Sequence, residues 1–207
     1  IPKKRPQVLL QAMAKLRGEL TLRADPKVGR VTPGAPSGTP IQPIGAHGVT
    51  RPTGMNVLAV FVGAGELENE LRELAARENL RVHFTGFKNQ SELPRYYAAA
   101  EVLVLPSESE TWGLVVNEAM ACGLPAIVSV AVGCAPDLIE GGRTGFAFPV
   151  ADVTALAGRL MALGEMKLAG YDFTPALEEK MRAYSLEEAV KGTVEAVRKL
   201  VTTKDER

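Results

Sequence analysis

Short apolar runs alternate with helical patterns along most of this 207-residue chain. The alternation is typical of βαβ units, whose right-handed crossovers place successive strands parallel to one another. We therefore predict an α/β fold, with a Rossmann-like parallel sheet covered by helices on both faces. The strands are expected over residues 57–62, 81–84, 102–106, 126–129 and 145–149.

One long segment interrupts this alternation. Between Leu16 and Leu58 the chain is rich in Pro, Gly, Thr and Ser and shows no apolar periodicity. A segment of this composition buries too little apolar surface to offset the entropy lost on ordering. We predict a single domain over residues 1–207 that carries a flexible insertion at about 17–56.

Charge and composition exclude several classes of protein. Lys plus Arg equals Asp plus Glu at 24 each, so no net field favours nucleic acid as a partner. No apolar run approaches the roughly 20 residues that span a bilayer, and the first residues do not form a signal peptide. The two cysteines are too few for a disulfide scaffold or a zinc site. We expect a cytoplasmic protein without a transmembrane segment.

Glu118 is the only charged residue from Thr111 to Pro125. A helix is predicted to begin near Thr111, as a possible N-cap, and to stop at Gly123. A carboxylate in such a neighbourhood needs a partner. Its neighbours one turn away on this helix are the apolar Leu114, Val115, Ala121 and Cys122.

The predicted helix follows a buried strand at its carboxyl end, the edge at which open α/β sheets bind ligands. Its first turn offers free N–H groups around Gly113, Leu114 and Val115, together with the positive end of the helix dipole. A phosphate bound there would lie roughly 5 Å from Glu118 along the helix axis. A ribose on one side of a diphosphate would then present its hydroxyls to Glu118, and Glu110 would face the group on the other side. The spacing favours a nucleotide that carries a sugar.

Each of these features also has an ordinary structural interpretation. Glu110 is also consistent with a solvated loop charge, and Glu118 with an ion pair to a Lys or Arg. The Gly63-Ala-Gly65 stretch suits a tight turn between strand and helix, because no third glycine follows in register. Lys4 is consistent with a solvated charge near the chain terminus, and Phe87 and Lys88 with exposed turn residues.

The segment 107–125 resembles the carboxyl-terminal, donor-binding domain of family 4 retaining glycosyltransferases, which have the GT-B fold. The signature is two Glu separated by seven residues, Glu110 and Glu118, with an aromatic-Gly pair after the first. Several further segments carry the likeness in the same order along the chain, namely residues 3–10, 61–67, 84–88, 93–98 and 133–145.

The resemblance implies transfer of a hexose from a nucleoside diphosphate sugar to an acceptor hydroxyl. Glu110 would be the catalytic residue that faces the sugar, and Glu118 would hold the ribose. The chain contains no Asp-x-Asp pair, so we expect neither a metal nor another cofactor. The diphosphate and the base would be bound by Gly113, Leu114, Val115, Lys4, Phe87 and Lys88.

The resemblance also implies parts that this chain lacks. These are the amino-terminal acceptor domain, the first strand of this half of the GT-B architecture, and a partner arginine just before Ile1. We therefore expect the chain to bind nucleotide but to have little or no transferase activity alone. Any peripheral contact with the inner membrane would come through the acceptor domain. The alternatives are a non-catalytic nucleotide-binding or assembly module, and a sugar-nucleotide epimerase with the same fold.

Overall fold

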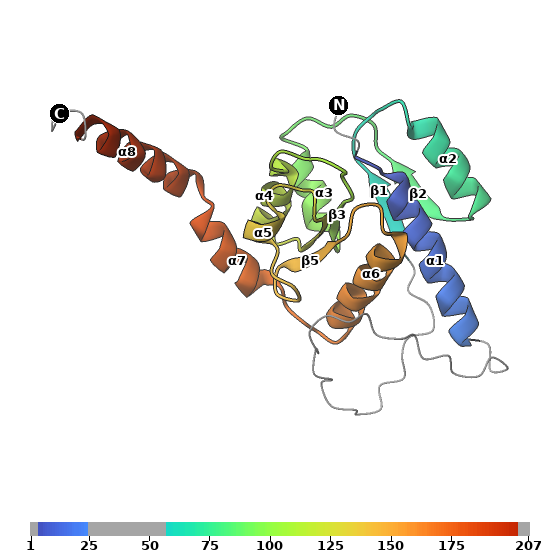
Figure 1. Ribbon diagram of the computed structural model, residues 1–207. Coiled ribbons are helices and arrows are strands. Elements are labelled where there is room, and N and C mark those ends of the chain that lie inside the picture. The colour runs from blue at the N-terminus through green and yellow to red at the C-terminus, as the bar shows by residue number, and fades with distance from the viewer. Residues whose placement is uncertain (1–3, 25–56, 203–207) are drawn as a thin grey trace.

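The computed structural model describes residues 4–24 and 57–202 (Figure 1). Helices and strands alternate along these residues, as the sequence predicts. The elements in chain order are α1 (Gln7–Ala24), β1 (Leu58–Phe61), α2 (Glu68–Arg77), β2 (Arg81–Phe84), α3 (Leu93–Ala99), β3 (Leu103–Leu105), α4 (Leu114–Ala121), β4 (Ala126–Ser129), α5 (Ala135–Leu138), β5 (Gly145–Phe148), α6 (Val153–Leu168), α7 (Thr174–Ala183) and α8 (Leu186–Thr202).

The strands form two parallel sheets. β1 pairs with β2, with Leu58 opposite Arg81, and β4 lies between β3 and β5. Every residue of β4 is buried, because helices cover both of its faces. On one side α1 packs against α2 and α6, and on the other α4 packs against α3 and α7. The predicted α/β fold with helices on both faces of parallel strands is confirmed.

α1 holds the two sheets together (Figure 1). Val8, Ala12 and Leu16 belong to the apolar core formed with β3, β4 and β5. Leu10 and Met13 belong to the separate core formed with β1 and α2. α1 therefore contributes side chains to the cores of both sheets.

α1 is longer than the sequence indicates. The flexible insertion was expected from about residue 17, but residues 17–24 continue the helix. Arg17 donates hydrogen bonds to the carbonyl oxygens of Glu78 (3.0 Å) and Asn79 (2.8 Å), which ties this part of α1 to the end of α2. Leu, Glu, Arg and Ala, which supply much of the last turns of α1, also have high helix propensity. Residues 25–56 lie outside the described part of the chain.

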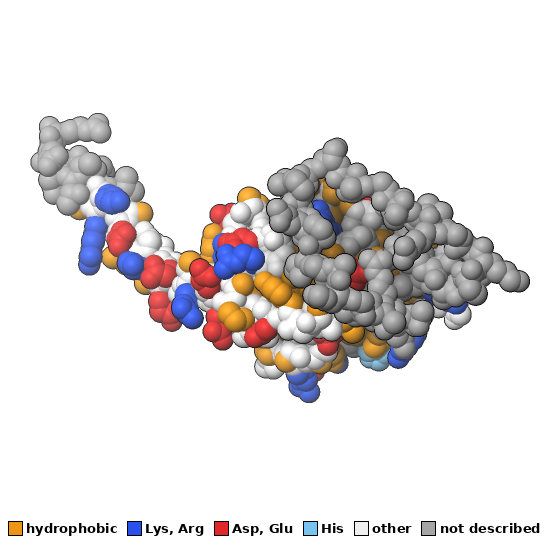
Figure 2. Space-filling model, turned by 90° about the horizontal axis from the view of Figure 1, so that it is seen from below, with side chains coloured by type: hydrophobic (Ala, Val, Ile, Leu, Met, Phe, Trp, Pro, Cys, Tyr) orange, Lys and Arg blue, Asp and Glu red, His pale blue; other side chains and the backbone are white. Residues whose placement is uncertain are grey.

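α7 packs against α4 with Leu177 fully buried, and α8 then leads away from the body of the molecule (Figure 1). Apolar side chains recur along α8 at helical spacing and are exposed. Figure 2 shows acidic and basic side chains along the same projecting arm. α8 is therefore an amphipathic helix with its apolar stripe open to solvent, and the stripe consists of Leu186, Val190, Val194, Val197 and Val201.

Candidate functional site

α4 begins at Leu114, and its N-cap is Gly113 in a left-handed conformation with φ +96°. The prediction that the helix begins near Thr111, with Thr111 as its N-cap, is therefore wrong. The chain before α4 is held by a neighbouring loop instead, because the N–H of Cys134 donates to the carbonyl oxygen of Trp112 (2.9 Å). Only after this contact does Gly113 turn the chain sharply into the helix.

Two features of position 113 require a glycine. A Cβ atom at Gly113 would lie 2.8 Å from Cγ1 of Val132, and the left-handed conformation disfavours other residues. Within the described residues, the N–H groups of Gly113, Leu114 and Val115 donate no hydrogen bond, and the first to do so is Val116, to Gly113 (2.8 Å). The start of α4 thus presents unpaired donors and the positive end of the helix dipole.

Glu118 lies one turn into α4 and is half-buried. Its Oε2 atom accepts a hydrogen bond of 2.8 Å from the hydroxyl of Tyr97 on α3. No Lys or Arg forms an ion pair with Glu118 among residues 4–24 and 57–202, so the alternative of an ion-paired helix residue is not what the structure has. The partner that this carboxylate needs is a neutral hydroxyl.

Tyr97 is a site residue that the sequence did not reveal. Burial raises the pKa of Tyr97 well above its ordinary value, and the hydrogen bond to Glu118 and the negative charge of Glu118 raise it further. The hydroxyl therefore stays protonated and can donate at neutral pH. No spacing pattern links Tyr97 to Glu118, because the contact depends on the packing of α3 against α4.

Glu110 lies in the loop that follows β3, and its side chain is half-buried. Its backbone is bonded on both sides to the loop after β4. The N–H of Glu110 donates to Ala131 (3.3 Å), and the N–H of Gly133 donates to Glu110 (2.9 Å). A Cβ atom at Gly133 would lie 2.0 Å from the carbonyl oxygen of Thr111, so the two loops are in direct backbone contact. The position of Glu110 is thus fixed from the backbone.

Buried polar groups lock these loops further. The hydroxyl of Ser129 at the end of β4 donates to the carbonyl oxygen of Ser107 after β3. The Sγ atom of Cys134 lies 4.0 Å from the carbonyl oxygen of Gly113. Burial raises the pKa of the Cys134 thiol to about 11, so this cysteine stays neutral and unreactive at physiological pH. The loops at the carboxyl ends of β3 and β4 therefore form one rigid edge.

The remaining predicted site residues lie near this edge or at the neighbouring sheet. Lys4 is exposed, and the next residue, Arg5, forms an ion pair with Glu108, two residues before Glu110. Phe87 follows the carboxyl end of β2 and is 78% exposed. Lys88 pairs with Glu92 at 3.9 Å. The structure thus places Arg5, the residue after Lys4, against the Glu110 loop, and Phe87 and Lys88 after the carboxyl end of β2 in the other sheet.

In the Gly63-Ala-Gly65 loop, Gly63 is bonded to the chain that follows β2. Its N–H donates to the carbonyl oxygen of Gly86 (2.9 Å), and the two residues form an isolated bridge. A Gly63 N–H that is bonded to the protein cannot also bind a phosphate. The loop belongs to the segment 62–67 that connects β1 to α2.

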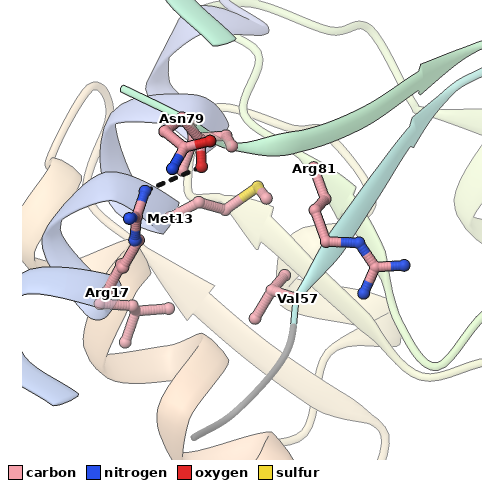
Figure 3. A pocket seen from close by; sticks show the side chains of 7 residues that line it. Met13, Arg17, Val57, Asn79 and Arg81 are labelled. Carbon is pink, nitrogen blue, oxygen red and sulfur yellow. Dashed lines mark hydrogen bonds between the residues drawn. The ribbon is translucent and has the colours of Figure 1, made fainter. Parts of the chain in front are cut away.

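Two pockets lie away from the start of α4. One, of about 320 Å³, is lined by Arg17, Asn79 and Arg81 at the amino ends of β1 and β2 (Figure 3). The other, of about 640 Å³, lies between the carboxyl end of α4 and α7. Ligands of open α/β sheets bind at the carboxyl edge, so neither pocket is the candidate site. Among the described residues no group of three His, Cys, Asp or Glu is arranged to hold a metal ion, and no helix is long and apolar enough to cross a membrane.

Comparison with known proteins identifies the family of the chain. Residues 46–187 match the family model described as glycosyl transferases group 1. The chain is 42% identical over 106 residues to sulfoquinovosyl transferase SQD2 of Arabidopsis thaliana. This match covers 50% of this chain and 20% of that protein. It is 35% identical over 158 residues to D-inositol 3-phosphate glycosyltransferase of Streptomyces scabiei. This match covers 75% of this chain and 30% of that protein.

Solved structures share the fold. Sucrose-phosphate synthase of Thermosynechococcus elongatus matches 72% of this chain and 39% of its own, with a TM-score of 0.61 and 29% identity. Anabaena HepE in complex with UDP matches 96% of this chain and 46% of its own, with a TM-score of 0.67 and 22% identity. The chain thus spans less than half of each of these proteins, and 20% and 30% of the two curated relatives. Since the family model covers more than half of the sequence, the chain belongs to the glycosyl transferases group 1 family.

Proposed function

We propose that this chain is the donor-binding half of a retaining glycosyltransferase. The donor would be a nucleoside diphosphate sugar, from which a hexose passes to an acceptor hydroxyl. The observation that carries the proposal is the start of α4, where three N–H groups are unpaired among the described residues and Glu118 follows one turn later. The Anabaena HepE structures in complex with UDP and with UDP-glucose support this class of ligand, because their fold is similar.

The diphosphate would bind at the amino end of α4. The N–H groups of Gly113, Leu114 and Val115 donate to its oxygens, and the helix dipole favours its negative charge. The exposed Lys4 adds a positive charge, with the adjacent Arg5 anchored to Glu108. These groups neutralise the diphosphate as it leaves, so the proposed reaction needs no metal ion.

The two carboxylates would hold the sugars on either side of the diphosphate. Glu118 accepts hydrogen bonds from the ribose hydroxyls, and Glu110 accepts them from the hydroxyls of the transferred hexose. Phe87 and Lys88 would contact the base from the carboxyl end of β2. With the hexose held in this way, an oxygen of the leaving diphosphate can assist removal of the acceptor proton on the same face of the sugar, which leads to retention of configuration.

The acceptor would be bound by a second half that lies outside this chain. The family relatives are several times longer than the matched region, which supports this division. The chain by itself would then supply half of the catalytic cleft.

We expect the purified 207-residue chain to bind a nucleoside diphosphate and to show little or no hexose transfer. The measurement combines calorimetric titration with UDP, GDP and ADP, and product analysis with the corresponding sugar nucleotides and simple acceptor alcohols. Robust turnover by the chain alone would contradict the division into two halves. Failure to bind any of the three diphosphates would favour a structural or assembly module, and epimerised sugar nucleotide among the products would favour an epimerase.

A further inference from the structure

The hydrogen bond between Tyr97 and Glu118 joins two helices across 21 residues of sequence. Both side chains are half-buried, and α3 packs directly against α4 at this point. The roles given above to the diphosphate and sugar sites do not use Tyr97. A hydroxyl that reaches a carboxylate from another helix, at 2.8 Å, determines where that carboxylate points.

We propose that Tyr97 is a positioning residue that orients the Glu118 carboxylate for a ribose and thereby makes the site select nucleotides with a complete vicinal diol. The proposal rests on the proposed function, in which Glu118 binds ribose. It adds the element that holds Glu118 ready and the selectivity that follows.

The geometry of the carboxylate supports this role. A Glu side chain has three rotatable bonds, and on a helix it turns toward water unless a partner holds it. The Tyr97 hydroxyl uses one acceptor position on Oε2 and leaves the other Oε2 position and both positions on Oε1 open. Two ribose hydroxyls can therefore bind to the same carboxylate without displacing Tyr97. Because the orientation exists before the ligand arrives, binding loses less entropy.

The chemistry of the partner matters as much as its position. A Lys or Arg in the place of Tyr97 would pair with the charge of Glu118 and compete with the ribose for it. A neutral hydroxyl leaves the carboxylate charged, so its hydrogen bonds to the ligand stay charge-assisted. A tyrosine hydroxyl is protonated at neutral pH, and burial raises the pKa of Tyr97 further, so Tyr97 remains a hydrogen-bond donor across the physiological range.

The test is calorimetric titration of the full chain with UDP and with 2′,3′-dideoxy-UDP, or with the GDP or ADP pair if that base binds more tightly. The wild-type protein is expected to prefer the ribonucleotide by about tenfold or more. In Tyr97→Phe, affinity for the ribonucleotide should fall by about 3- to 10-fold, while affinity for the dideoxy compound changes by less than about twofold. Tyr96→Phe is the matched control, a half-buried tyrosine on the same helix, and should behave as wild type.

The outcomes separate this inference from the function on which it rests. If Tyr97→Phe weakens both ligands equally, Tyr97 has a structural role only, and if it weakens neither, Tyr97 has no role in binding. Either result overturns the inference while the function stands. If the wild-type protein shows no preference for the ribonucleotide, or if Glu118→Ala keeps it, then Glu118 does not bind ribose, and the inference fails together with that part of the proposed function. Thermal unfolding of each variant verifies that it is folded.

Discussion

Replacing Glu118 by Ala is expected to weaken the binding of a nucleoside diphosphate by about 1–3 kcal/mol, or about 5- to 150-fold. The reason is the loss of a charged acceptor that lies one helical turn beyond the unpaired N–H groups of α4. Titration calorimetry on the wild-type and Glu118→Ala proteins measures the difference directly.

Glu70→Ala is the matched control for this change, because Glu70 is an exposed carboxylate on α2 in the other part of the fold. It removes the same charge and should leave affinity within about twofold of wild type, since surface substitutions outside a site have small effects. Equal affinities for Glu118→Ala and Glu70→Ala would mean that the isolated carboxylate of α4 does not contact the nucleotide.

Gly133→Ala is expected to lower the free energy of unfolding by about 3 kcal/mol or more. The added Cβ would lie 2.0 Å from the carbonyl oxygen of Thr111, so the loops after β3 and β4 must separate. Their separation breaks the hydrogen bonds from Gly133 to Glu110 and from Cys134 to Trp112. Denaturant unfolding followed by circular dichroism measures the loss.

The control for this prediction is Gly141→Ala, since nothing lies within 4 Å of a Cβ at Gly141. That variant should be about as stable as wild type. If Gly133→Ala matched it in stability, the close contact between the two loops would not exist in solution, and the account of how Glu110 is held would be wrong.

The elements that the sequence predicts well are those with strong local patterns. All four residues of β4, three of which are apolar, are buried, and the end of α4 is set by Gly123, which adopts a left-handed conformation. The predicted start of α4 was wrong because it depends on contacts with residues far away in the sequence. Gly113 becomes the N-cap because Val132 and Cys134 from another loop pack against the chain there, and no local signal carries that information.

In the site, too, local sequence patterns predict some features, and tertiary packing determines the others. The unpaired N–H groups of α4 and the isolated charge of Glu118 follow from helix periodicity and could be inferred from sequence. Tyr97 and the ion pair between Arg5 and Glu108 could not, because they join segments that only the tertiary packing brings together. The length of α1 was missed because Arg17 gains its partners from the end of α2, far away in the sequence.

The proposed function depends on binding of the diphosphate at the amino end of α4. Its most direct test is an NMR titration of the isotopically labelled chain with UDP, GDP and ADP, following the backbone amides. We expect the amide signals of Gly113, Leu114 and Val115 to shift most strongly and to saturate together with the calorimetric signal. Saturable binding that leaves these three amides unchanged and shifts signals elsewhere, such as the pocket near Arg17, would contradict it.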